Sequence, residues 1–263
     1  MDVKIDDIVK QVLSEVGTCK ADKTPFTLER KPVFTGNETG KTAVLASPEN
    51  YEIKEYKIPE ISAKEILVQV EGCCVAPFDT AEFMKEKRIG QAALTGQQGT
   101  GLIVKLGSAS LQDAKGNTLK VGDKIVAVRK AGGSVSAFGG NRVGTGVTVN
   151  GWFSSYIVLQ AGSQIYQVND LELESRLLTE TAIAVNSAVQ RAAKLNHLDD
   201  TKKVVILGCG LEGLTAISAL KCLGVRNIMA IDGTDSRLKL AKEFGASETI
   251  DYRDKKGMPA IIE

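Results

Sequence analysis

The sequence predicts an α/β protein built in two successive parts. Residues 41–168 hold short runs rich in β-branched residues, separated by glycine- and proline-bearing turns, which is the pattern of an all-β unit. From residue 169 the apolar period changes to helical spacing, and strands then alternate with helices. With 43% hydrophobic and 25% charged residues, the 263-residue chain has the composition of a globular protein large enough for two domains.

Charge and cysteine content exclude several classes of function. Lysine and arginine number 33 and aspartate and glutamate 32, so no strong field exists to hold nucleic acid or an anionic membrane. The five cysteines are scattered and odd in number, and no leader or long apolar span is visible. We therefore expect a reducing, cytoplasmic setting without a nucleic-acid or membrane partner.

The first element expected is a short helix within residues 1–18. In "VKIDDIVKQVLSEV" apolar residues recur at helical spacing and leave the charged residues on the other face. Residues 19–40 have no period and carry glycine, proline and threonine, so they are predicted to be a linker. The helix is thus expected to be tethered to the fold.

Strands are expected next, in the runs "TAVLA", "EIKEYKI", "EILVQVEG", "GTGLIVKLG", "KVGDKIVAV" and "GWFSSYIVL". Residues 131–151 are too rich in glycine to pack a core and are predicted to form a long surface loop. This all-β part ends near Val168.

The second part begins with a helix in "LELESRLLTETAIAVNSAVQRAAKL". "KKVVILGCGLEGLTAISALKCLGVRNIMAID" then reads as strand, glycine turn, helix and strand, which is one βαβ unit. "SRLKLAKEFG" predicts a further helix, "ASETIDYRD" a third strand, and "MPAIIE" the start of another helix.

The turn of the βαβ unit carries the strongest functional signal. It reads Gly208-Cys209-Gly210-Leu211-Glu212-Gly213. A G-x-G-x-x-G spacing alone is weak, but here it follows a strand and opens a helix. The first glycine permits the tight turn, the second allows backbone N–H groups to approach a pyrophosphate, and the third brings helix and strand together. The alternative is a packing turn without a ligand.

Asp232 strengthens the dinucleotide interpretation. It lies nineteen residues beyond Gly213, at the end of the next strand, where a carboxylate accepts from an adenosine ribose hydroxyl. The same carboxylate would repel a 2′-phosphate, so NAD is favoured over NADP. Glu212 is an awkward neighbour for a phosphate unless its side chain points away along the helix.

The combined layout resembles the medium-chain dehydrogenase/reductase superfamily, the alcohol dehydrogenase-like enzymes. "LKVGDKIVAV" is similar to the family's Val-Gly-Asp-x-Val turn, "GWFSSYIVL" to its Gly-x-(Phe/Tyr)-Ala-Glu-Tyr strand, and "LKLAKEFGASETIDYRD" to its second helix and third strand. The resemblance covers residue 41 to the end and implies a GroES-like catalytic domain over 41–168 and a Rossmann domain over 169–263.

The resemblance also shows what is missing from the catalytic-zinc site. Zinc-dependent members have Cys-Gly-x-Cys-x-(Ser/Thr)-Asp where this chain has "CCVAPFD". Alignment on Asp79 puts Ala76 at the cysteine ligand and Gln97 at the histidine ligand, and His197 is far away in sequence. Glu180 resembles the Glu of the Glu-Pro pair in polyol-type members. Glutamine is a poor zinc ligand and one carboxylate does not hold zinc.

The structural-zinc lobe of the family has its place in residues 131–151, which contain no cysteine. We therefore predict no metal site, and we expect Cys73 and Cys74 to be buried strand residues rather than ligands. "APFDT" resembles the Asn-Pro-x-Asp-Thr of the zinc-independent quinone-oxidoreductase branch, with Ala76 in place of the asparagine.

The leading hypothesis is a zinc-independent, NAD-linked oxidoreductase for a small polar alcohol, carbonyl or amine. By resemblance Asp79 and Thr80 lie near the cleft, Gln97 could orient a carbonyl, and Glu180 could act as base or bind an amine. Each of these residues could instead make ordinary hydrogen bonds in a turn. The alternatives are a zinc-type alcohol or polyol dehydrogenase with unconventional ligands and a non-catalytic, microcompartment-associated binding remnant.

Two further expectations concern the ends of the chain. Residues 1–18 resemble the encapsulation peptides that dock enzymes onto bacterial microcompartment shells, although the helix could equally pack on its own fold. The chain stops at Glu263, inside what should be a helix of the first Rossmann half. We therefore expect a truncated Rossmann domain, and the resemblance implies a homodimer for the full-length protein.

Overall fold

The computed structural model describes residues 34–84, 96, 98–128, 151–160, 164–195, 198 and 202–254. The helix expected within residues 1–18 lies outside these ranges, as does the loop expected over 131–151 except for Gly151. The chain divides into two compact units, one ending at Glu180 and the other beginning at Thr181, so the division falls inside a helix. Each unit is described separately.

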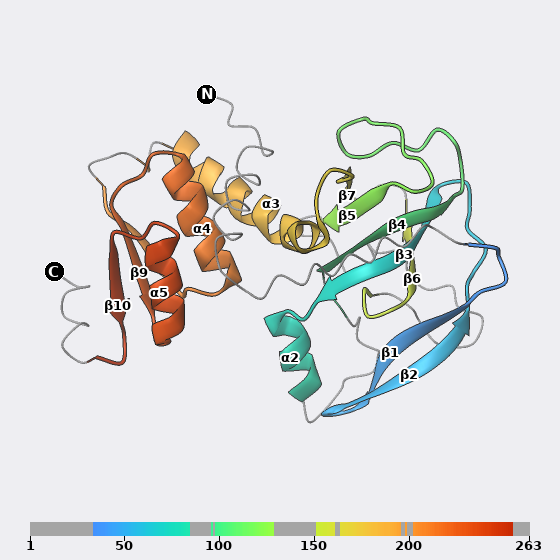
Figure 1. The fold of residues 1–263 in the computed structure, drawn as a ribbon, viewed down its shortest axis with the longest axis horizontal. Coiled ribbons are helices and arrows are strands. Elements are labelled where there is room, and N and C mark those ends of the chain that lie inside the picture. Colours follow the sequence, from blue (N-terminus) through green and yellow to red (C-terminus); the bar gives the residue numbers. More distant parts are fainter. Residues whose placement is uncertain are drawn as a thin grey trace. The chain divides into compact units, whose positions relative to one another are not determined.

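The first unit is built from antiparallel sheets. Its five-stranded sheet has the order β6-β3-β4-β5-β7, and every neighbouring pair is antiparallel. The strands are β3 (Glu65–Cys74), β4 (Gln98–Leu106), β5 (Lys124–Val128), β6 (Tyr156–Gln160) and β7 (Gln164–Gln167). A hairpin of β1 (Thr39–Ser47) and β2 (Asn50–Lys57) forms a second sheet, and α2 (Pro77–Met84) follows β3 (Figure 1).

The core of this unit comes from the inward faces of the sheet. Its fully buried members include Ile66, Val68, Ile103, Ile125, Trp152 and Leu159. Tyr56 connects the hairpin to the five-stranded sheet, because its hydroxyl donates a 2.7 Å hydrogen bond to the carbonyl of Tyr156 in β6. Burial raises the pKa of Tyr56 to about 12, so this hydroxyl stays a donor.

The second unit contains a parallel three-stranded sheet of order β10-β9-β8. Its elements are β8 (Val204–Leu207), α4 (Leu211–Cys222), β9 (Ile228–Asp232), α5 (Asp235–Glu243) and β10 (Glu248–Asp251). Helix α3 (Leu173–Lys194) begins in the first unit and contributes Val189 to the core of the second. The central strand β9 is buried along its whole length, and α4 and α5 lie beside it (Figure 1).

The expected fold class is confirmed: antiparallel sheets come first and a parallel strand-helix unit follows. The structure adds α2 and β7, neither of which the sequence pattern predicted. Strand β5 begins only at Lys124, because Lys120 N donates to the Asp123 carboxylate and closes a turn in the run expected to be continuous strand. Thr39 and Gly40, expected in a linker, are the first residues of β1.

Within the described ranges, none of the helices is both long and apolar enough to cross a membrane.

Candidate functional site

The glycine turn joins β8 to α4, and the fold itself gives a structural reason for two of its glycines, Gly208 and Gly213. Gly208 has φ +88, a left-handed conformation that favours glycine, and its N–H donates to the carbonyl of Ile231 at 2.8 Å. At Gly213 a Cβ would lie 1.9 Å from the Gly208 carbonyl oxygen, so no larger residue fits. Gly210 is the N-cap of α4, and a Cβ there would meet nothing within 4 Å.

The N-terminus of α4 is open for an anion. No side chain caps it, so the N–H groups of its first turn are left for another acceptor. Leu211 is 40% exposed and Glu212 is exposed, and both belong to this first turn. Cys209 is fully buried, and burial and the Asp232 carboxylate together raise the pKa of its thiol although Arg237 opposes them. Cys209 is therefore a neutral core residue.

Asp232 lies at the end of β9 and its carboxylate is tied to the glycine turn. Its Oδ2 accepts from Cys209 N at 2.7 Å and its Oδ1 from Thr234 N at 2.8 Å. Burial raises the pKa of the carboxyl, but these hydrogen bonds and the Arg237 guanidinium, 4.0 Å away, lower it more. The pKa lies below its ordinary value, and Asp232 is a fixed anion with lone pairs left for a hydroxyl donor.

These groups fit the adenosine diphosphate part of a dinucleotide. The turn offers a close backbone approach, the helix end offers uncapped donors, and Asp232 offers a carboxylate beside them. All the predicted cofactor residues therefore lie on one edge of the second unit: Gly208, Gly210, Leu211, Glu212, Gly213 and Asp232.

In the first unit, Asp79 holds the backbone at Ala76, the position that the family resemblance matches to a zinc ligand. Pro77 starts α2, and Asp79 in its first turn accepts from Ala76 N at 2.8 Å, a capping-box arrangement. Its other oxygen accepts from Gly96 N at 3.1 Å. Asp79 is 3% exposed, so the structure places it as a buried acceptor for two backbone donors.

The structure describes two of the three remaining predicted catalytic residues. Thr80 is exposed, and its hydroxyl donates to the Ala76 carbonyl at 3.2 Å. Gln97 lies outside the described residues. Glu180, in α3, is 8% exposed and close enough to Cys74 to affect its pKa.

Cys73 and Cys74 end β3, as expected, but the expectation that both are buried is wrong. Cys73 is exposed and Cys74 is half-buried. Cys73 lines a cavity between β3, β1 and residues 152–155, whereas Cys74 contacts α3. Burial and then the Glu180 and Asp79 carboxylates raise the pKa of Cys74, and its thiol donates to the Leu177 carbonyl at 3.7 Å.

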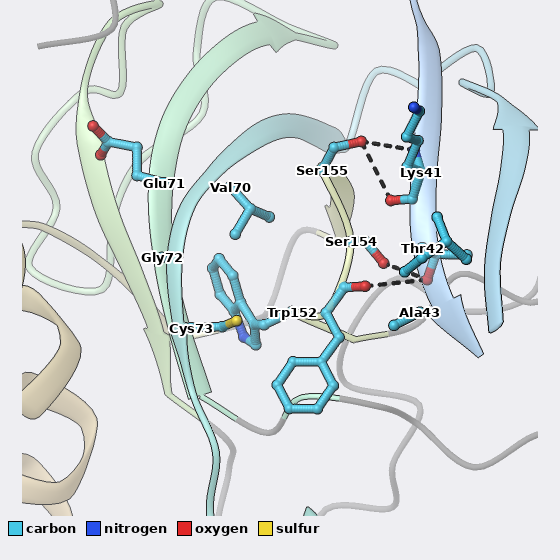
Figure 2. A pocket seen from close by; sticks show the side chains of 12 residues that line it. Lys41, Thr42, Ala43, Val70, Glu71, Gly72, Cys73, Trp152, Ser154 and Ser155 are labelled. Atoms are coloured by element: carbon cyan, nitrogen blue, oxygen red, sulfur yellow. Dashed lines mark hydrogen bonds between the residues drawn. The ribbon is translucent and has the colours of Figure 1, made fainter. Parts of the chain in front are cut away.

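The cavity beside Cys73 has a volume of about 290 Å³. Figure 2 shows Cys73 next to Trp152, with Ser155 hydrogen-bonded to the backbone of Lys41 across the opening. Trp152 is buried, and its indole N–H has no hydrogen-bond partner in the part of the chain that the structure describes. The lining is mostly apolar and carries no cluster of charged groups.

The described residues around Ala76 do not form a complete set of zinc ligands. Ala76 has no side-chain ligand, and within the described ranges no three His, Cys, Asp or Glu residues lie close enough to hold a metal ion. Cys74 and Glu180 are neighbours, but two ligands leave a tetrahedral site half empty.

Sequence reasoning missed two pairings in this unit. Arg176 of α3 forms a buried ion pair with Glu71 of β3, and Cys74 meets Glu180, 106 positions further along the chain. The sequence around Glu71 and around Arg176 contains no pattern that predicts their ion pair.

Comparison with known proteins supports the alcohol dehydrogenase-like superfamily. The family model described as zinc-binding dehydrogenase matches residues 213–263. An L-threonine 3-dehydrogenase from Stenotrophomonas maltophilia is 28% identical over 209 residues, 77% of this chain and 60% of its own. A scyllo-inosose 3-dehydrogenase from Thermotoga maritima is 24% identical and covers 81% of this chain and 60% of its own.

A crystal structure of an alcohol dehydrogenase from Thermotoga maritima is similar with a TM-score of 0.68 and 26% identity, covering 83% of this chain and 64% of that one. The chain thus spans about 60% of the length of the curated relatives it matches. The family match lies within the second unit, so it contains none of the positions where metal ligands were sought.

Proposed function

We propose that this protein is the catalytic and adenosine-binding portion of an NAD(H)-linked oxidoreductase that works without a catalytic zinc ion. The observation that carries the proposal is the hydrogen bond between Asp232 and Cys209 N, which fixes an anionic acceptor beside the glycine turn. The relatives are dehydrogenases, which supports the reaction class.

The cofactor would bind along the edge formed by the turn and Asp232. Backbone donors at the start of α4 would hold the pyrophosphate, and Asp232 would accept from a ribose hydroxyl. NAD is favoured over NADP because Asp232 is ionised at neutral pH and would repel a 2′-phosphate. When bound, the nicotinamide supplies the hydride donor or acceptor.

The substrate side would be served by the first unit. Glu180 is the residue best suited to accept or return the proton of a substrate hydroxyl or amine, since its side chain is a buried carboxylate. Thr80 exposes a hydroxyl, and we propose that the side-chain amide of Gln97 donates a hydrogen bond to a substrate carbonyl. We assign Asp79 a positioning role, because its two oxygens hold the start of α2 and the backbone at Gly96.

Cofactor binding can be measured directly. NADH fluorescence should change saturably on titration with the chain, and Asp232→Ala should weaken binding at least tenfold, because it removes the ribose acceptor. Lys203→Ala, an exposed residue of the same unit paired with Glu248, is the matched control and should bind like the parent. Absence of a saturable change at millimolar NADH would refute the proposal.

The zinc-dependent alternative is separated by elemental analysis. We expect zinc well below one equivalent in protein purified without chelator, and no loss of NADH binding or turnover after chelation. Stoichiometric zinc that disappears in Glu180→Ala would favour unconventional ligands, since Glu180 is the carboxylate next to Cys74.

A further inference from the structure

Tyr252 is an exposed aromatic residue at the same edge as the glycine turn. It follows directly after β10 and is 57% exposed, which makes it one of the few large apolar side chains presented to solvent by the second unit. Figure 1 shows β10 next to β9. An exposed ring beside a candidate ligand edge is a surface that a flat apolar group can cover.

The ring is held next to Asp232 by close packing. A Cβ on Gly233, the residue after Asp232, would lie 2.5 Å from Tyr252 Cζ, so the phenol ring rests against the Gly233 backbone. The Tyr252 N–H donates to the Asp232 carbonyl at 3.3 Å. The absence of a side chain at Gly233 is therefore what allows the ring to approach.

The turn that carries the ring is also braced on its other side. Arg253 donates to Asp251 at 2.6 Å and to Asp235, at the start of α5, at 2.7 Å. These pairs connect the end of β10 to α5. The backbone at Tyr252 thus has fixed neighbours on both sides, and its ring is preorganised rather than free.

The order of groups along the edge follows the order of the strands. The glycine turn follows β8, Asp232 ends β9 and Tyr252 follows β10, and these strands are parallel neighbours about 4.8 Å apart. Pyrophosphate, ribose and base occur in the same order in adenosine diphosphate. A ribose on Asp232 with its pyrophosphate at the turn therefore carries the base toward β10.

We propose that the Tyr252 ring stacks on the adenine base of the dinucleotide and that Gly233 is kept free of a side chain to admit the ring. This inference rests on the proposed function, since it assigns one more residue to the same site. It predicts that the base, and not only the phosphates and ribose, contributes to affinity through this chain's own tyrosine.

The test is calorimetric titration of the full chain with ADP-ribose, which contains no nicotinamide. Tyr252→Ala should weaken binding about tenfold, the scale of losing one base–aromatic stack. Tyr252→Phe keeps the ring face and should bind like the parent. Gly233→Ala should weaken binding to a similar degree as Tyr252→Ala, and adding it to Tyr252→Ala should cause no further loss.

Two further measurements separate lost stacking from a loss of folding. Tyr252 is exposed, so the thermal midpoint of Tyr252→Ala should stay at the parent value. Nuclear Overhauser effects should connect the tyrosine ring to adenine H2 or H8 and vanish in Tyr252→Ala. If the parent binds ADP-ribose and Tyr252→Ala binds equally well, the stacking is wrong and the proposed function stands; if the parent does not bind, both fall.

Discussion

Replacing Asp79 tests whether it positions the fold or moves a proton. In Asp79→Ala two backbone donors lose their acceptor: Gly96 N–H, which is buried, and Ala76 N–H, which is partly buried. A buried donor without an acceptor costs about 1–3 kcal/mol, and a lost helix cap about 1 kcal/mol. We therefore expect Asp79→Ala to lower the free energy of unfolding by about 2–4 kcal/mol, a large part of an ordinary domain's stability.

The amide variant refines this prediction. Asp79→Asn keeps one acceptor oxygen but turns an NH₂ group toward the other backbone donor, so about half of the loss should remain. Thr80→Val is the matched control, because its exposed hydroxyl makes one 3.2 Å bond; it should change stability by no more than about 0.5 kcal/mol.

Urea unfolding followed by tryptophan fluorescence measures these values. Trp152 is the single tryptophan, and its backbone N–H donates to the Gly96 carbonyl, so it reports on the segment that Asp79 anchors. An unchanged unfolding midpoint in Asp79→Ala, together with lost hydride transfer, would refute the positioning role and restore the catalytic one. We expect the ADP-ribose affinity to be the same in all three variants.

Three further predictions concern the cofactor edge and the N-terminus. Gly213→Ala puts a Cβ 1.9 Å from the Gly208 carbonyl oxygen, so it should abolish ADP-ribose binding and lower the thermal midpoint by several degrees. A parent-like midpoint in differential scanning calorimetry would contradict this prediction, because it would show that the turn accommodates the Cβ. The pKa of Asp232 is lowered on folding, so its carboxylate stabilises the fold above its unfolded pKa, and this contribution is lost as the pH falls through the folded pKa. The urea midpoints of the parent and Asp232→Asn should therefore converge below about pH 4. A constant difference between the two midpoints down to pH 2 would contradict the lowered pKa. Under the hypothesis that residues 1–18 are an encapsulation peptide, their deletion should leave the thermal midpoint unchanged and abolish co-purification with microcompartment shell protein. Retained co-purification, or none with the parent chain, would count against targeting.

The candidate cofactor edge could be predicted from the sequence because its residues lie close together along the chain. The three glycines and Asp232 lie within 25 consecutive residues, and their strand-turn-helix context fixes where they meet. The hydrogen bond from Cys209 N to Asp232 then follows from the pairing of β8 with β9. Tyr252 was not identified as a ligand residue, because its role depends on the absent side chain at Gly233.

The first unit was less predictable because its contacts are distant in sequence. Helix α2 is only eight residues long and depends on Asp79, which also bonds Gly96 seventeen positions later. Cys73 is exposed because residues 152–155 and β1 leave a cavity at the end of β3, and no pattern around Cys73 contains that information.

The position that resembles a zinc-ligand position and the candidate cofactor edge belong to different units of the chain. Every group proposed to hold the adenosine part of the cofactor belongs to the second unit, whereas Ala76, Asp79 and Glu180 belong to the first. Ala76 contributes no atom to the candidate cofactor edge, so under the proposed function a substitution at Ala76 should leave cofactor binding intact. Cofactor binding can therefore be measured separately from hydride transfer, which itself requires the bound cofactor. A variant with cysteine at Ala76 and histidine at Gln97 should acquire zinc affinity without a change in the ADP-ribose affinity, because its new ligands and the glycine turn share no residue.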